Sequence, residues 1–201
     1  MYDALHNFFG RNVRVVSPRE RMVISTALLI RERGAHSTAI SDVLEHSGAP
    51  RGSAYHYFPG GRTQLLCEAV DYAAEYTAAR VAKADSSVTA VDVIVEGFRR
   101  LLIESDYRAG CPVVAVAVEA DNQPVIERAA AAFTRWTELI AARLMTDGVA
   151  PERAEELAML LMTSVEGAIV VARTARDVKP LDLIHRQLRA IVAAETPKAS
   201  R

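Results

Sequence analysis

The chain of 201 residues is poor in the side chains that build metal centres and disulfide networks. It contains two cysteines, Cys67 and Cys111, which have no paired spacing and are typical of a reducing compartment. Its five histidines are scattered along the chain, so they form no cluster with metal-ligand spacing. We therefore expect neither a bound metal nor a cofactor.

The sequence also lacks the signs of a membrane protein and of an enzyme. No apolar run approaches the roughly 18 residues of a membrane span, and no signal peptide opens the chain. This predicts a cytoplasmic protein without a membrane partner. Paired carboxylates, a nucleophile beside a base and a glycine-rich phosphate loop are missing too, which argues against catalysis.

What is present is enough apolar surface for a folded core, with charge divided unevenly along the chain. Half of the residues are hydrophobic and 24% are charged, which excludes a disordered or collagen-like chain. The net charge is −1, but residues 1–62 hold eight arginines against five acidic residues. The remaining 139 residues have 16 basic and 20 acidic side chains. A positive front on an acidic body suggests that the two parts have different tasks.

The hydrophobic period predicts an all-α fold. Ser17 and Pro18 begin the first helix as its cap and first residue, and Gly34 ends it. The run at 112–119 is short and β-branched, as in a strand, but it has no partner strand and begins at a proline. We therefore expect a helix there as well. The predicted helices span about 18–33, 39–46, 50–56, 62–85, 88–105, 112–119, 124–145, 151–176 and 180–194.

Two short helices joined by a turn at 47–49 form a helix-turn-helix pattern, which places its second helix in the major groove of DNA. Thr38 is the expected N-cap of the first of these helices. Small residues allow close approach to the duplex, arginines pair with phosphate or guanine, and polar aromatic side chains suit phosphate oxygens. In an ordinary soluble helix Tyr55 would instead be a core aromatic, as we expect of Phe58. The predicted DNA-binding residues are Thr38, Arg51, Gly52, Ser53, Tyr55, His56, Tyr57 and Arg62.

At these residues the sequence resembles the TetR family of one-component transcriptional regulators. Helix lengths and turns agree with the family across residues 18–72. Two departures, one residue more in Phe-Pro-Gly-Gly-Arg and an arginine in place of the usual lysine, resemble the lincomycin- and flavonoid-responsive (LmrA/YxaF-like) subgroup. That subgroup also has a Gly-Cys-Pro-Val run, which stands here at 110–113. The segments that match the family pattern are Gly48-Ala49, Tyr55-His56-Tyr57-Phe58 and Arg62-Thr63-Gln64-Leu65.

The resemblance implies a homodimeric repressor that binds a near-palindromic double-stranded operator and is released by a small-molecule effector. It implies a four-helix dimer interface made by the last two helices of each subunit. The two reading helices are then about 34–36 Å apart, one duplex turn, or a multiple of it. The effector is expected to shift the region 88–120 and swing the helix that begins at Arg62. A DNA-binding regulator without a small ligand, controlled by a protein partner or constitutive, is the alternative.

These considerations divide the chain into four parts. Residues 1–16 show no sustained period and are expected to be a flexible arm, with contact of Arg11 and Arg14 to DNA as the alternative. Residues 17–62 are the expected DNA-binding domain, with three helices. The larger helical domain at 63–195 is expected to bind the ligand and to dimerise, and a short tail follows at 196–201.

The helix at 151–176 is apolar on nearly every side, which is typical of a helix that is buried all round. Gly167 and Ala168 permit close approach of another helix. We therefore expect one face to be buried in its own subunit and another in a partner chain. Burial wholly within one subunit is the alternative.

An effector pocket is expected among apolar side chains of the larger domain, where an ordinary core position is the alternative for each. Glu166 is unusual because a carboxylate within an apolar helix needs a partner. It could instead cap a helix or pair with an arginine across the dimer. Cys111 could sense oxidants, although a lone cysteine beside proline in an apolar run is more often inert. The predicted ligand-binding residues are Phe98, Leu102, Cys111, Val114, Val118, Glu119, Asn122, Phe133, Trp136, Met162 and Glu166.

Overall fold

The computed structural model describes residues 16–196, and within this range the chain is built from helices alone. The all-α prediction is confirmed, including the helix at 112–119. The predicted arm with Arg11 and Arg14, and the predicted tail, lie outside the described residues apart from Val16 and Thr196. The helices are α2 (Pro18–Arg33), α3 (Ile40–Ser47), α4 (Ser53–Tyr57), α5 (Gly61–Ala82), α6 (Ser87–Glu104), α7 (Pro112–Glu119), α8 (Gln123–Thr146), α9 (Pro151–Ala175) and α10 (Lys179–Glu195).

Most helices begin at the residues that favour a helix start. The Ser17 hydroxyl accepts a hydrogen bond from the N–H of Glu20 (3.1 Å), and Ser86 does the same for Thr89 (3.1 Å). A proline lies in the first two positions of α2, α7, α8, α9 and α10. The missing N–H of proline is harmless there, because the first N–H groups of a helix have no partner within it.

Two predicted helix starts near the turn are wrong. The N-cap of α3 is Ala39 rather than Thr38. The Asp42 carboxylate accepts a hydrogen bond from the N–H of Ala39 (3.0 Å), so a side chain of the first turn holds the N-cap residue in place. α4 begins at Ser53 rather than at Pro50, because residues 50–52 form a turn in which the Pro50 carbonyl accepts the N–H of Ser53 (2.9 Å).

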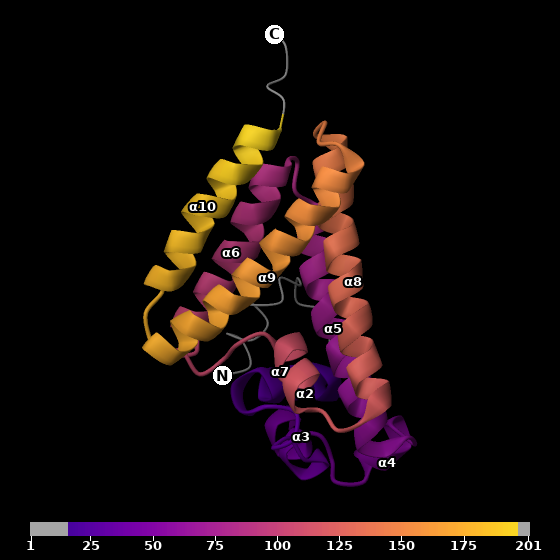
Figure 1. Cartoon of the computed structure of the whole chain (residues 1–201). Coiled ribbons are helices and arrows are strands. Elements are labelled where there is room, and N and C mark those ends of the chain that lie inside the picture. Colours follow the sequence, from indigo (N-terminus) through magenta and orange to yellow (C-terminus); the bar gives the residue numbers. More distant parts are fainter. Residues whose placement is uncertain (1–15, 197–201) are drawn as a thin grey trace.

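The helices form a small head and a longer body (Figure 1). The head consists of α2, α3 and α4 at the lower end of the view. α5 runs from the head into the body, where it packs along α8, and it also packs on α2. In the body α9 packs against both α8 and α10, and α10 packs on α6. The short α7 lies against α2 and α8, so it joins body to head.

The apolar core follows the same division. Phe58 is 1% exposed and packs in the head with Met22 and Leu65, which confirms it as a core aromatic. A second cluster joins α2 to α5, α7 and α8 and includes Ile30 and Trp136. The largest cluster holds α6, α8, α9 and α10 together. Since α2 contributes to the first two clusters, head and body are packed on one another.

α9 is the one helix among the described residues that is long and apolar enough, by length and composition, to cross a membrane. The expectation that no stretch resembles a membrane span is corrected here. Of its most apolar stretch, 39% is buried, and α8 and α10 pack against the helix. The rest of α9 is exposed in the single chain, so the helix is not buried wholly within one subunit. The exposed apolar residues of α9, at 42–53%, are Met159, Leu160, Val170 and Val171.

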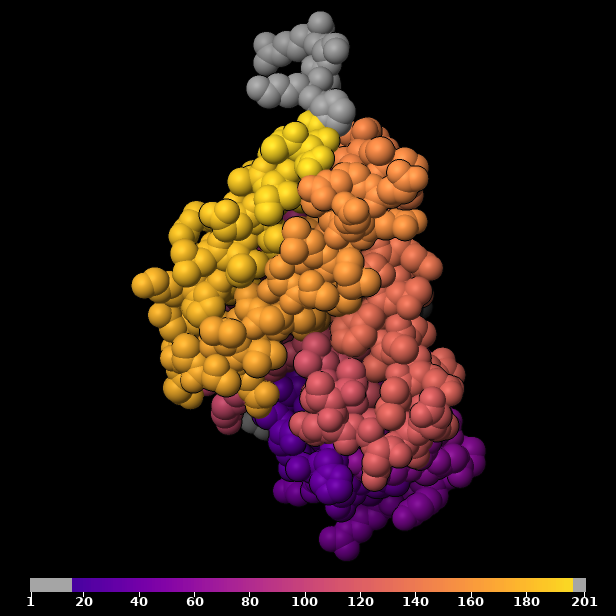
Figure 2. Space-filling model, viewed as in Figure 1, coloured from indigo at the N-terminus to yellow at the C-terminus, as the bar shows by residue number. Residues whose placement is uncertain are grey.

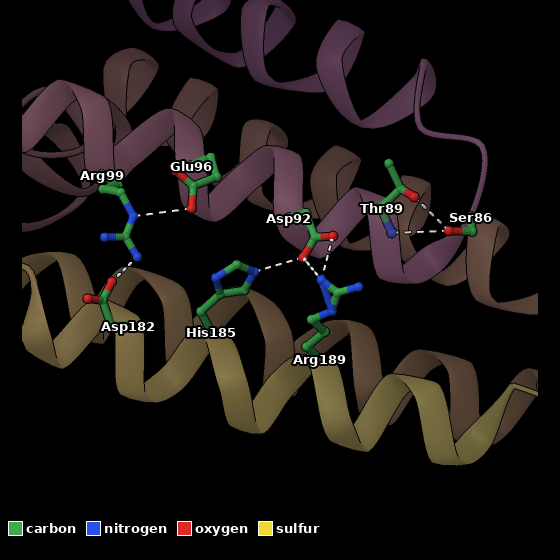
Figure 3. Close-up of polar contacts among 8 residues, drawn as sticks. All are labelled: Ser86, Thr89, Asp92, Glu96, Arg99, Asp182, His185 and Arg189. Atoms are coloured by element: carbon green, nitrogen blue, oxygen red, sulfur yellow. Dashed lines mark hydrogen bonds and ion pairs between the residues drawn. The ribbon is translucent and has the colours of Figure 1, made fainter.

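A row of polar contacts fixes α10 on α6 (Figure 3). The Asp92 carboxylate of α6 contacts Nε2 of His185 (2.8 Å) and the guanidinium of Arg189 (3.0 Å), both on α10. Further along, Arg99 of α6 pairs with Asp182 of α10. Partly exposed ion pairs contribute only about 0–1 kcal/mol each. Their main effect is therefore to set the register of α10 rather than to stabilise the body.

Replacing Leu144 by alanine should destabilise the body. Leu144 is fully buried in the largest cluster, and such a change lowers the free energy of unfolding by about 2–5 kcal/mol. Chemical denaturation followed by circular dichroism measures the change. Its neighbour Met145 is 42% exposed and provides the matched control, since M145A should cost less than about 1 kcal/mol. Equal effects of the two variants would contradict the packing of α8 described above.

Candidate DNA-binding and effector sites

The helix-turn-helix is shaped by a left-handed glycine and by two buried side chains. Gly48 ends α3 with φ of +64°, a conformation that residues with a Cβ rarely adopt. Ala54 and Phe58, each 1% exposed, hold the inner side of α4 in the core of the head. The opposite side of α4 therefore faces outward.

The outward side carries most of the predicted DNA-binding residues. Tyr55 is 73% exposed, so it is no core aromatic. The rings of His56 and Tyr57 meet edge to face with centroids 5.1 Å apart. The Ser53 hydroxyl donates to the Pro50 carbonyl (2.6 Å). The structure thus brings together on one exposed or half-exposed segment Arg51, Gly52, Ser53, Tyr55, His56 and Tyr57.

Thr38 and Arg62 lie outside this segment, and their side chains brace the loop between α2 and α3. Thr38 is 1% exposed, and its hydroxyl donates to the carbonyl of Gly34 (2.7 Å). Arg62, at the start of α5, donates from Nε to the Thr38 carbonyl (2.9 Å) and from Nη2 to the Ala35 carbonyl. Both side chains therefore hold the connection between α2 and α3 in shape.

The last turn of α2 is where the head meets the body. The N–H of Gly110, in the loop before α7, donates to the carbonyl of Arg31 (2.8 Å). Arg173 of α9 donates to the carbonyl of Glu32 (2.8 Å). Gly34 ends the helix with φ of +87°, and a carboxylate at the end of α7 fills the space that a Cβ would need. The position of α2 thus depends on α7 and α9.

Two narrow recesses enter the body, and the second of them reaches this junction at Arg31. The first extends between α6, α8 and α9 to Met162 and Glu166. The second extends toward α2, α5 and α7, where Arg31 and Cys111 line it. The two recesses share part of their wall. The shared wall consists of Thr77, Ile94, Phe98 and Trp136.

The predicted ligand-binding residues are distributed over more than these recesses. Val114, Val118 and Glu119 line a wider, more open groove that Cys111 and Glu166 also reach. The predicted ligand-binding residues that line the two recesses are Phe98, Cys111, Trp136, Met162 and Glu166.

The other three predicted residues have structural contacts. Asn122 lines a small hollow beside Arg62, and its amide donates to the Thr63 hydroxyl (3.0 Å). Leu102 is fully buried in the core of the body and lines neither recess, nor the groove, nor the hollow. Phe133 also lines none of them and packs edge to face on Trp136, with centroids 5.8 Å apart.

Sequence reasoning missed the polar residues of the second recess, Arg31, Tyr76, Thr77 and Arg80. Burial lowers the pKa of the Arg31 guanidinium from its ordinary value to about 10, against the raising effect of Glu32 and nearby groups. Arg31 thus remains a cation at neutral pH. Its spacing of four residues from Ala27 on the apolar stripe was the available signal, because it places both side chains on the inward face of α2.

Glu166 combines burial with an unused hydrogen-bond acceptor. Its Oε2 is buried and has no hydrogen-bond partner among the described residues. Burial raises the pKa of this carboxyl to about 7, and the adjacent Cys111 thiol, a weak donor, acts in the opposite direction. Burial also raises the pKa of the Cys111 thiol well above its ordinary value, which is typical of an unreactive cysteine.

Known proteins match both parts of the chain. Residues 25–69 match the family described as bacterial regulatory proteins of the tetR family. Residues 87–187 match the C-terminal domain of LmrA/YxaF-like transcriptional regulators. The chain belongs to the TetR family. TetR-family proteins of this kind are transcriptional regulators rather than enzymes, and they act on DNA operators as dimers.

Relatives of this TetR-family protein match it over nearly their full length. The uncharacterized HTH-type transcriptional regulator Rv0196 of Mycobacterium tuberculosis is 60% identical over 191 residues, which cover 92% of this chain and 98% of that protein. YxaF of Bacillus subtilis is 30% identical over 180 residues, with coverages of 87% and 94%. The crystal structure of a TetR regulator from Chloroflexus aurantiacus has 29% sequence identity to this chain and a TM-score of 0.71. The match covers 89% of this chain and 95% of that chain.

The buried carboxyl of Glu166 should make the stability of this regulator fall as pH rises from about 4.5 to about 7. Between these values the folded state holds a proton that the unfolded state has released. A displacement of this size corresponds to a loss on the order of 3 kcal/mol. E166Q cannot ionise, so its free energy of unfolding should decline less over the same interval, as measured by urea denaturation at several pH values.

The matched control is Glu155→Gln, on the exposed side of the same helix. This variant should keep the pH dependence of the unchanged protein. Superimposable pH profiles for E166Q and the unchanged protein would show that Glu166 is ionised in the folded state at low cost.

Proposed function

We propose that this TetR-family protein is a cytoplasmic repressor that binds a near-palindromic operator as a homodimer and is released by a small, mostly apolar or aromatic effector. The observation that carries the proposal is the shared use of α2. One side of this helix supports the exposed α4, and Ala27 and Arg31 on it line the second recess. A molecule in that recess therefore touches the support of the proposed reading helix.

The proposed DNA contacts come from the outward side of the segment 51–57. The major groove admits an α-helix, and the exposed Tyr55 and His56 lie on that side of α4. Arg51, in the turn before α4, is exposed and positioned to meet phosphate or a guanine edge. Thr38 and Arg62 take part indirectly, because they hold the loop between α2 and α3.

The proposed dimer forms through α9 and α10, which lie side by side on one face of the molecule (Figure 2). Besides the exposed apolar residues of α9, the adjoining α10 exposes Leu183, at 46%. Exposed apolar surface on two adjoining helices favours an interaction site on a soluble protein. The contacts of Asp92 with His185 and Arg189 hold α10 from the α6 side, so the two helices present a firm surface.

Release is proposed to follow from widening of the recesses. Since both are narrow, an effector must displace side chains such as Phe98, and close-packed interiors transmit such shifts. The shift reaches α2 through the recess wall and α5 through Thr77, which changes the separation of the two α4 helices in the dimer. A typical coupling of about 1–3 kcal/mol weakens operator binding roughly 5- to 150-fold. If no compound weakens it, the alternative of a regulator without a small ligand holds.

The DNA-binding proposal predicts that selection from a random duplex library enriches an inverted repeat. Binding to the enriched duplex, measured by fluorescence anisotropy, should weaken steeply as salt rises, because phosphate contacts release counterions. Y55F should weaken binding about tenfold on the repeat and on unrelated duplexes alike, as expected for loss of one hydrogen bond to a charged phosphate oxygen. Binding to a scrambled duplex equal to that of the selected one would refute the proposal.

Two controls separate contact with DNA from a change in folding. The free energy of unfolding of Y55F should equal that of the unchanged protein, since the side chain is exposed. Arg51→Ala should weaken binding to DNA, whereas Arg100→Ala should not. Arg100 is equally exposed but lies on α6, in the body. A destabilised Y55F with normal affinity would assign Tyr55 a packing role.

The dimer proposal predicts that Val171→Glu dissociates the protein. Val171 is 53% exposed on α9, and a carboxylate at the centre of an apolar interface would lose its hydration. The dimer dissociation constant should rise about 100-fold or more, as measured by sedimentation equilibrium, and affinity for the inverted repeat should fall with it. Ile103→Glu is the matched control, since Ile103 is 55% exposed near the end of α6. A dimer that survives V171E would place the interface elsewhere.

A further inference from the structure

The second recess has an unusual distribution of charge. Its described lining includes two arginines, Arg31 and Arg80, but no aspartate or glutamate. The remainder of its wall is mostly apolar and aromatic, with Phe98 and Trp136 in the part shared with the first recess. A positive site is thus embedded in surroundings that exclude water and favour an apolar molecule.

The two arginines line the recess together with Tyr76. Arg80 donates from Nη1 to the Tyr76 hydroxyl (3.0 Å), and its guanidinium lies over the Tyr76 ring, 5.6 Å from the centroid. Its other hydrogen bond goes to the carbonyl of Val93 (3.4 Å). These partners are uncharged. Tyr76 and Arg31 also line the recess, so both arginines and this tyrosine border the same space.

Two details indicate that this positive site is part of the fold. Arg31 is 8% exposed, which separates its charge from most of the surrounding water. Nearby carboxylates, Glu32 and Glu104, attract Arg31 but do not line the recess. An anion within the recess would form charge-assisted hydrogen bonds with the arginines, and these bonds are strong where little water screens the charges.

From this arrangement we infer that the effector is an organic anion, an apolar or aromatic body with one acidic group, and that Arg31 and Arg80 bind that group. The inference rests on the proposed function and specifies the chemical class of its effector. Because Arg31 belongs to α2, the acidic group binds directly to the helix that supports α4. The aromatic body fills the space along Phe98 and Trp136.

A pair of fluorescent probes that differ in charge tests the inference on the full chain without DNA. 1-Anilinonaphthalene-8-sulfonate carries one negative charge, and N-phenyl-1-naphthylamine is the same ring system without the sulfonate. R80M should bind the sulfonate at least tenfold more weakly than the unchanged protein and bind the neutral amine equally well. Trp136 is the only tryptophan of the chain, so energy transfer from it reports binding near the recess.

Further variants keep the result interpretable. Arg135→Met removes an exposed arginine of α8 that pairs with Glu75, and it should bind both probes as the unchanged protein does. R80K keeps the charge and should retain most of the affinity for the sulfonate. R31M should repeat the loss seen in R80M, provided that circular dichroism shows it folded. Equal weakening of both probes by R80M, or no weakening of either, overturns the inference.

The proposed function has a separate outcome. If R80M weakens the binding of both probes equally, or of neither, while an inverted repeat is still selected, the inferred class of effector is wrong and the repressor proposal stands. If no duplex is preferred over its scrambled form, the repressor proposal fails, whatever the probes show.

Discussion

The structure depends on how the last turn of α2 is held. The carbonyl groups that end a helix have no partner within it, and here Gly110 and Arg173 donate to two of them from the body. Beyond this turn the connection to α3 is braced by Arg62. The same helix contributes to the core of the head and to the cluster that joins head and body. A movement of the body therefore reaches the head through a few identified hydrogen bonds.

This arrangement explains why the proposed effector site and the proposed DNA surface need no long path between them. Arg31 lies on the recess side of α2, while Met22 of the same helix packs with Phe58 beneath α4. A rigid helix of 16 residues links the two. The two sites are thus coupled by the tilt of one packed helix. Small shifts in a recess produce such a tilt because a close-packed interior moves between discrete arrangements.

Much of the fold could be predicted from the sequence because its signals are local. Prolines and the Ser17 cap mark helix starts, and the hydrophobic period separates buried from exposed sides. Residues three apart share a face of a continuous helix, so the exposure of Tyr55 and the burial of Phe58 reflect the end of α4 at Tyr57, after which Phe58 has a non-helical backbone. The cap of α3 was misassigned because Thr38 and Asp42 both offer side-chain oxygens, and only the folded loop decides between them.

The recesses were harder to predict because they are spaces between helices rather than segments of sequence. Phe98 and Leu102 are one turn apart on the same stripe of α6, yet only Phe98 lines a recess. The difference comes from neighbours on other helices, which the period of α6 does not contain. Arg31 and Arg80 were overlooked for a related reason. Each is a single charge on a helix, and only packing shows that both enter one space.

α9 has one more consequence. Met162 and Glu166 line a recess on one side of this helix, and Leu160 and Val171 are exposed on the other. If two subunits meet along the exposed side, their bound effectors lie back to back with little more than a pair of helix diameters between them. The first molecule to enter would then alter the site of the second, and linkage makes that influence equal in both directions. The dependence of operator release on effector concentration would then be set by both subunits together, and it would be steeper or shallower than for a single independent site.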